Sequence, residues 1–189
     1  MNEYLYQRQI IAYHGCDESV AKQVFDKNEP LAPEEKDYHW LGQGIYFWEH
    51  GAERAYDWAC ENRKNPAVIG AIIHLGNCFD LLDLRYTQTL SDAWPRFQQF
   101  KADRGESMPK NEAPKNDPNR EKLLHRRDCA VINWTIEQLE KEGAVPYDSV
   151  RGVFQESDLV FEGSAIHLKS HIQISIRNPA CILGYFRPS

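Results

Sequence analysis

Hydrophobic and polar positions along the chain follow two periods, one typical of strands and one typical of helices. The clearest segment is the apolar run at 67–75, which Pro66 and Gly76 bound and which predicts a buried strand. The same reasoning predicts further strands at 8–14, 44–47, 150–154, 159–161, 171–177 and 181–186. Apolar residues at helical spacing predict helices at 17–27, 51–62, 88–103 and 120–142. Helices early in the chain and strands late predict an α+β fold.

The predicted strand at 171–177 has two chemically different faces. Successive side chains of a strand point to opposite faces, so Ile172, Ile174 and Ile176 are expected to face the core. The other face then carries four polar side chains, those of His171, Gln173, Ser175 and Arg177. This polar face is a candidate for chemistry.

Length and charge limit the class of protein. A chain of 189 residues is expected to form a single domain over 1–189, here with a helical insertion at about 86–146. The net charge of −6 argues against a general nucleic-acid coat protein. No apolar run is long enough for a membrane helix, and the polar N-terminus has no signal-peptide core. The five cysteines lack zinc-like spacing. We therefore expect a cytoplasmic protein with reduced thiols, no metal and no membrane contact.

Two short motifs carry the candidate chemistry. Tyr13-His14-Gly15 ends an apolar run with an imidazole and a glycine, and Gly44-Ile45-Tyr46-Phe47 delivers aromatic side chains from a glycine-containing turn. Glycine lets a ligand approach the backbone, and tyrosine offers a stacking face with a polar tip. These groups suit a flat aromatic amide and a ribose, and so predict that the protein uses NAD.

The two motifs, followed by a predicted helix, resemble the ADP-ribosyltransferases of the poly(ADP-ribose) polymerase and diphtheria-toxin class. That family has split antiparallel sheets with flanking helices, and a His, Tyr and Glu, sometimes Gln, on three separated strands. The resemblance implies NAD as co-substrate and His14, Tyr46 and Gln173 as catalytic residues. It also implies that Gly15, Tyr56 and Trp58 bind the nicotinamide together with His14 and Tyr46. It covers the first third of the chain well, the last third by pattern only, and nothing at about 80–146.

The third position departs from the usual carboxylate of the family. Gln173 can bond a ribose hydroxyl through its carbonyl oxygen, but it has no charge with which to act as a base or to stabilise a cation. We therefore expect transfer of a single ADP-ribose rather than polymer formation. Glu162 is the nearest spare carboxylate and is the alternative third residue.

The acceptor is left open as RNA, DNA or protein. The basic cluster at 120–127 could meet phosphates if it is helical. Alternatively it is a solvated helix face with Glu121 and Asp128 as partners. The resemblance implies a bacterial toxin or phage-defence protein, and with it a neutralising antitoxin or inhibitor protein.

Two alternatives belong to other classes of protein. A cysteine hydrolase would use Cys129, near a predicted helix start that lowers a thiol pKa, with His167 or His171 as its base. A non-catalytic module that binds NAD, ADP-ribose or another protein would explain the missing third carboxylate. Release of nicotinamide would separate the transferase from the module.

Overall fold

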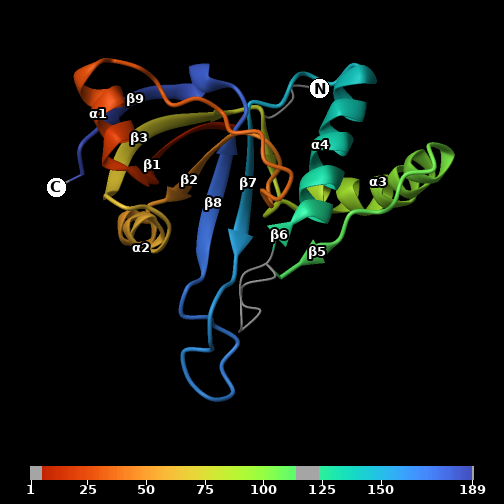
Figure 1. Ribbon diagram of the computed structural model, residues 1–189. Coiled ribbons are helices and arrows are strands. Elements are labelled where there is room, and N and C mark those ends of the chain that lie inside the picture. The colour runs from red at the N-terminus through yellow and green to blue at the C-terminus, as the bar shows by residue number, and fades with distance from the viewer. Residues whose placement is uncertain (1–5, 114–123, 189) are drawn as a thin grey trace.

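The computed structural model describes residues 6–113 and 124–188, which form a mixed sheet with helices around it (Figure 1). The helices are α1 (Glu18–Asp26), α2 (Ala52–Asn62), α3 (Leu84–Asp103) and α4 (Arg126–Lys141), with a short 3-10 helix, η1, at Pro179–Cys181. The strands are β1 (Tyr6–Asp17), β2 (Ile45–Glu49), β3 (Pro66–Gly76), β4 (Cys78–Asp80), β5 (Asn111–Glu112), β6 (Leu124–His125), β7 (Ser149–Phe154), β8 (His171–Ile176) and β9 (Ile182–Phe186).

The large sheet has seven strands in the order β4-β7-β8-β2-β1-β3-β9, and β5 and β6 form a separate pair. All neighbours in the large sheet are antiparallel except β4 and β7. The mixed architecture agrees with the α+β class, but the strands form one sheet and not the split pair that we expected. The reason lies in β2, which pairs with β8 on one side and, through Ala12↔Glu49 and Tyr13↔Trp48 alone, with β1 on the other.

Two hydrophobic clusters hold the helices on the sheet. One cluster joins β1, β2, β3 and β8 to Ala21 and Val24 of α1. The other joins β7 to Ile132 and Ile136 of α4. In the view of Figure 1, α1 lies above and α2 below the part of the sheet formed by β1 and β3. Each helix buries part of its predicted apolar face, including Val24 in α1, Ala59 in α2, Phe97 in α3 and Ile136 in α4.

Most predicted elements are present, with boundaries that differ by a few residues. Asp17 caps α1 by accepting a hydrogen bond from the Ser19 amide at 3.1 Å. Ile174 and Ile176 are fully buried, as the alternation in β8 predicts, whereas Ile172 near the start of the strand is only partly buried. The expected helix at 120–142 begins at Arg126, and its residues 120–123 lie outside the described part of the chain.

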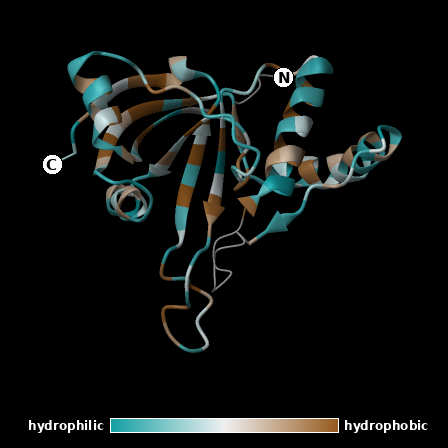
Figure 2. Ribbon diagram, viewed as in Figure 1, coloured by the Kyte–Doolittle hydropathy of each residue, from teal (hydrophilic) through white to brown (hydrophobic). Residues whose placement is uncertain are grey.

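The strand predicted at 159–161 is wrong. These residues lie in the long β7–β8 loop, which projects from the sheet and contains only an isolated bridge between Leu159 and His167 (Figure 1). Figure 2 shows hydrophobic residues in this loop as well as along the strands, and Phe161 is 66% exposed. Within the described part of the chain no strand or helix packs on this apolar run, so its strand propensity is not realised.

Among residues 6–113 and 124–188, no helix is long and apolar enough to cross a membrane.

Candidate functional site

His14 lies where β1 and β2 separate. The last residue pair between these strands is Tyr13↔Trp48, and His14 follows it in β1. The Nδ1 atom of His14 is 2.8 Å from the carbonyl oxygen of Tyr46 in β2. A carbonyl oxygen only accepts, so Nδ1 carries the proton and Nε2 of the neutral ring bears the lone pair. Burial lowers the pKa of His14, which favours this neutral form.

Gly15 allows α2 to pack directly on β1. A Cβ atom at this position would lie 2.2 Å from the carbonyl oxygen of Ala55 and 3.2 Å from the Trp58 ring. The sequence predicts that a ligand approaches the backbone closely at Gly15. On this side of Gly15, the backbone of α2 occupies that position instead. The packing of α2 on β1 also places Trp58 beside the site, and the Trp58 ring lies 5.8 Å from the ring of Trp48.

Tyr46 is fixed through its hydroxyl group. This hydroxyl donates to the carbonyl oxygen of Gly42 at 2.7 Å and accepts from the amide of Leu41 at 2.9 Å. The ring centroid lies 4.6 Å from that of His39. Burial raises the pKa of Tyr46 well above its usual value, so the phenol is neutral. Because both hydrogen bonds of the polar tip go to the protein, the ring face is the part of Tyr46 that remains for a ligand.

Gln173 lies in the middle of three strands, opposite Trp48 of β2 and Gly152 of β7. Its Oε1 atom accepts a hydrogen bond from Nε1 of Trp40 at 2.6 Å. The Trp40 indole lies over Gly152, where a Cβ atom would be only 2.8 Å from it. We expected the carbonyl oxygen of Gln173 to bond a ribose hydroxyl, whereas this oxygen bonds Trp40. An indole N–H can only donate, so the amide NH2 group is the end of Gln173 left for a ligand.

The structure places Tyr46 and Gln173 on one face of the sheet and His14 against the Tyr46 backbone, with the His14 ring packed on Phe47. His14 bonds the backbone of Tyr46, and Ser175 is the strand partner of Tyr46, so Gln173 is diagonal to Tyr46 on the same face of the sheet. Diagonal neighbours in an antiparallel pair lie about 7–8 Å apart, within reach of one ligand. The segment at 39–43 connects Tyr46 and Gln173, because its residues form hydrogen bonds with both of these side chains.

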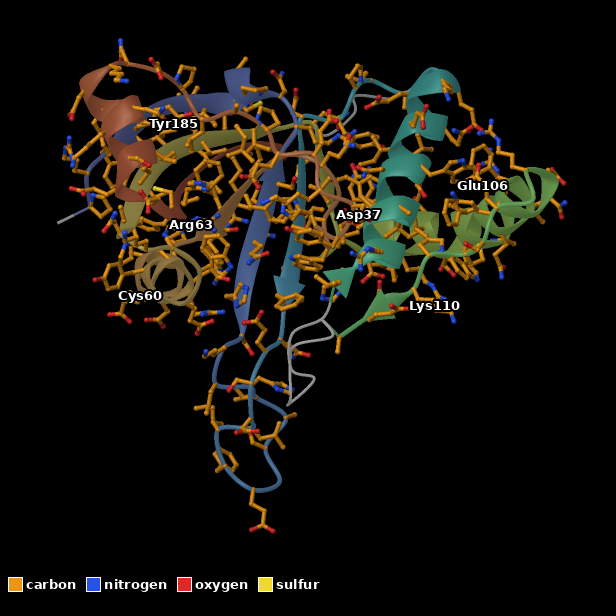
Figure 3. All side chains as sticks on the ribbon, in the orientation of Figure 1. Asp37, Cys60, Arg63, Glu106, Lys110 and Tyr185 are labelled. Carbon is orange, nitrogen blue, oxygen red and sulfur yellow. The ribbon has the colours of Figure 1, made fainter. Side chains whose placement is uncertain are left out.

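Tyr56 and Glu162 are not part of this arrangement. Tyr56 is 50% exposed on α2 and its hydroxyl lies beside Cys60, which Figure 3 labels together with Arg63, the residue that follows this helix. The Arg63 guanidinium lies 4.6 Å from the centre of the Trp58 ring. Glu162 is exposed in the β7–β8 loop, so the strand position favours Gln173 as the third residue.

Aromatic side chains that the sequence did not single out surround Gln173. The Phe154 ring lies 4.8 Å from Trp40 and 5.5 Å from His171, and Trp48 lies 6.3 Å from His171. One signal was available, because Trp40 comes just before the Gly42-Gln43-Gly44 turn. Nothing in the sequence could pair it with a residue 133 positions later.

Several basic side chains, two of them from the cluster at 120–127, are paired within the protein. Arg126 bonds Asp37 at 3.0 Å, and Arg127 donates to the carbonyl oxygen of Pro109 at 2.9 Å (Figure 3 labels Asp37). Arg151 is buried between Glu49 at 2.6 Å and Asp80 at 3.0 Å. The described part of the 120–127 cluster therefore favours a structural role, and residues 120–123 lie outside the described part.

The surroundings of Cys129 do not favour a nucleophilic thiolate. Burial raises the pKa of its thiol to about 11, although it lies in the first turn of α4. Its sulfur lies 3.5 Å from the carbonyl oxygen of Lys36 and 3.5 Å from the side-chain nitrogen of Asn133. The described contacts of His171 are with Lys169, Trp48 and Phe154, and none joins it to Cys129.

In the described part of the chain, no group of three or more His, Cys, Asp or Glu side chains is placed to hold a metal ion.

Comparison with known proteins gives no family. No family model matches the chain. Over 53 residues the chain is 42% identical to an uncharacterized protein of Methanocaldococcus jannaschii. The match covers 28% of this chain and 24% of that relative.

Proposed function

We propose that the protein is an NAD-dependent mono-ADP-ribosyltransferase with His14, Tyr46 and Gln173 in its active site. The observation that carries the proposal is the contact of His14 with the Tyr46 backbone where β1 and β2 separate, beside the face that Tyr46 shares with Gln173. The contact between His14 and the Tyr46 backbone joins the two strands, and Gln173 shares a face with Tyr46. The fold of the proposed family would place its three motif residues on three separated strands in the same way.

The proposed chemistry uses binding and orientation. Nε2 of His14 accepts a hydrogen bond from a hydroxyl of the nicotinamide ribose, and the ring of Tyr46 packs against the nicotinamide. Holding ring and ribose in one geometry favours cleavage of the glycosidic bond. Nicotinamide leaves with the bonding electron pair, and a nucleophile of the acceptor bonds the anomeric carbon. The acceptor is RNA, DNA or protein.

Gln173 supports transfer of one ADP-ribose unit. Its NH2 group donates to a ribose hydroxyl oxygen, since Trp40 occupies the carbonyl oxygen. A neutral amide stabilises a developing positive charge less than a carboxylate does. A cytoplasmic toxin or phage-defence role, with a neutralising antitoxin or inhibitor protein, is part of the same proposal and rests on the family resemblance.

The test uses NAD that carries a radioactive adenylate phosphate. Purified protein is incubated with this NAD and a host lysate, and the lysate is then split into protein and nucleic-acid fractions. Label in one fraction, lost with His14→Ala, supports the transferase and identifies the acceptor class. A protein that binds NAD but neither labels the lysate nor releases nicotinamide is instead the non-catalytic module. Two features of Gln173 favour this second candidate function. Its side chain is uncharged, and its amide oxygen already accepts a hydrogen bond from Trp40.

A further inference from the structure

His171 is the first residue of β8 and lies two positions before Gln173. Side chains two apart in a strand share a face, and the rise of about 3.3 Å per residue places these two about 6.6 Å apart along β8. The ring of His171 lies between Phe154 of β7 at 5.5 Å and Trp48 of β2 at 6.3 Å. His171 is therefore beside the proposed site, yet neither the sequence motifs nor the proposed chemistry uses it for group transfer.

The hydrogen bonds of His171 determine which ring nitrogen carries the proton. Nδ1 lies 2.7 Å from the carbonyl oxygen of Lys169, so Nδ1 is the donor. Nε2 is buried and has no hydrogen-bond partner within residues 6–113 and 124–188. Burial lowers the pKa of His171, so the ring is neutral near pH 7 and Nε2 bears a free lone pair. A buried polar atom without a partner needs an explanation, and a catalytic role is one of them.

The charged groups around His171 come from two segments. Arg54 of α2 lowers the pKa of His171 and Glu156 of the β7–β8 loop raises it, and these two side chains are paired at 2.5 Å. Lys169 of the same loop is 3.7 Å from Glu61 of α2. The nearest charges are thus paired with each other, and burial determines the direction of the shift.

We propose that His171 is the general base that removes the proton of the incoming acceptor nucleophile. This inference rests on the proposed transferase function. The bond between the nicotinamide nitrogen and the anomeric carbon breaks, and its electron pair leaves with nicotinamide. An oxygen or nitrogen lone pair of the nucleophile forms the new bond to that carbon. The proton of the nucleophile passes to Nε2 of His171, which later releases it to solvent.

The assignment gives Gln173 and His171 different roles on the same face of β8. Gln173 has no group that titrates, so it cannot take a proton. His171 has a lone pair, and the Lys169 carbonyl oxygen holds the ring by its other nitrogen, which is the usual arrangement of a general base. The acceptor group that this geometry fits is a neutral O–H or N–H, since an anionic nucleophile needs no base.

The test compares nucleophiles that need a base with one that does not. NAD is incubated with the protein in buffer that contains both methanol and azide, and methyl ADP-riboside, ADP-ribose and ADP-ribosyl azide are separated and counted. General-base catalysis contributes roughly 10²–10⁴-fold. In His171→Gln we expect the ratio of the methanol and water products to the azide product to fall at least about tenfold. A ratio is independent of the amount of folded enzyme.

Further variants make the outcome decisive. His171→Phe keeps an aromatic ring against Phe154 and Trp48, and should show the same fall in the ratio. His167→Gln is the matched control, because His167 bonds the Ser157 carbonyl oxygen at 2.8 Å within the β7–β8 loop, and it should keep the wild-type ratio. An unchanged ratio in both His171 variants would overturn the base assignment and leave the transferase intact. No release of nicotinamide by the wild-type protein would instead overturn the transferase itself.

Discussion

The indole N–H of Trp40 donates a hydrogen bond to the amide oxygen of Gln173 at 2.6 Å. The orientation of the amide follows from this contact, because the opposite orientation would place two donors against each other. The same segment bonds the hydroxyl of Tyr46 through Leu41 and Gly42. The loop before β2 therefore positions two side chains of the proposed site at once.

Replacing Trp40 by phenylalanine should weaken the use of NAD while the ring packing on Gly152 is kept. The variant loses one buried hydrogen bond, worth about 1 kcal/mol, and lets the Gln173 amide turn over. We expect kcat/KM for nicotinamide release to fall roughly five- to tenfold, as that energy implies. Steady-state kinetics with NAD measure this, and Trp94→Phe in α3 is the control. Equal kinetics for the two variants would show that Trp40 does not orient Gln173.

His14→Ala should abolish turnover of NAD and leave the protein folded. The variant removes the only proposed acceptor for the ribose hydroxyl, together with the contact to the Tyr46 backbone. Nicotinamide release measures turnover, and circular dichroism measures folding. His167→Ala in the β7–β8 loop is the control and should behave as wild type. Turnover at the wild-type rate in His14→Ala would remove the support for the proposed site.

Tyr46→Phe should lower the stability of the protein. The change leaves the Leu41 amide without its acceptor and Gly42 without its donor. A buried group that loses its partner costs about 1–3 kcal/mol, so the free energy of unfolding should fall by that amount. Urea denaturation measures it, with Tyr56→Phe on the exposed side of α2 as the control. A midpoint equal to that of the control would mean that these hydrogen bonds add nothing.

Acid should destabilise the protein through His14. Burial lowers the pKa of His14 below 6.5 in the folded state, so below pH 6.5 the unfolded chain takes up a proton that the folded protein does not. The free energy of unfolding should therefore fall as the pH drops from 6.5 toward the lowered pKa, by up to roughly 1.4 kcal/mol per pH unit. Burial also lowers the pKa of His39 and of His171, which act in the same direction.

Urea denaturation at several pH values measures this slope. His14→Gln removes the titrating group and should flatten the profile relative to wild type. The same slope in both proteins would show that His14 titrates alike in the folded and unfolded states.

The buried ion pairs of Arg151 should contribute more to the stability of the protein than an exposed ion pair does. Its side chain is 6% exposed, and those of Glu49 and Asp80 are 4% and 5% exposed. Arg151→Ala leaves two buried carboxylates without this partner and should cost about 3–5 kcal/mol of stability. Arg96→Ala breaks an exposed pair with Glu142 and should cost less than about 1 kcal/mol. Urea denaturation measures the free energy of unfolding of both variants. An equal loss of stability in the two would contradict the prediction that the buried ion pairs contribute more.

Local patterns in the sequence predicted the elements, and contacts between distant residues did not follow from them. The Asp17 cap and the buried isoleucines of β8 were predictable because each depends on neighbours within a few positions. The pairing of Trp40 with Gln173 depends on strand order, which periodicity does not specify. The strand prediction at 159–161 is wrong because it also depends on distant residues. The apolar pattern favours a strand, but no described strand pairs with this segment.

The sheet is weakest along the line that the proposed site occupies. Between β1 and β2 only two residue pairs are formed, whereas β1 and β3 pair along most of their length and β2 is paired with β8. Widening the gap beside His14 would break few backbone hydrogen bonds and leave each half of the sheet intact. If the protein binds NAD as proposed, an opening between β1 and β2 is therefore the change in the sheet that would cost the fewest backbone hydrogen bonds.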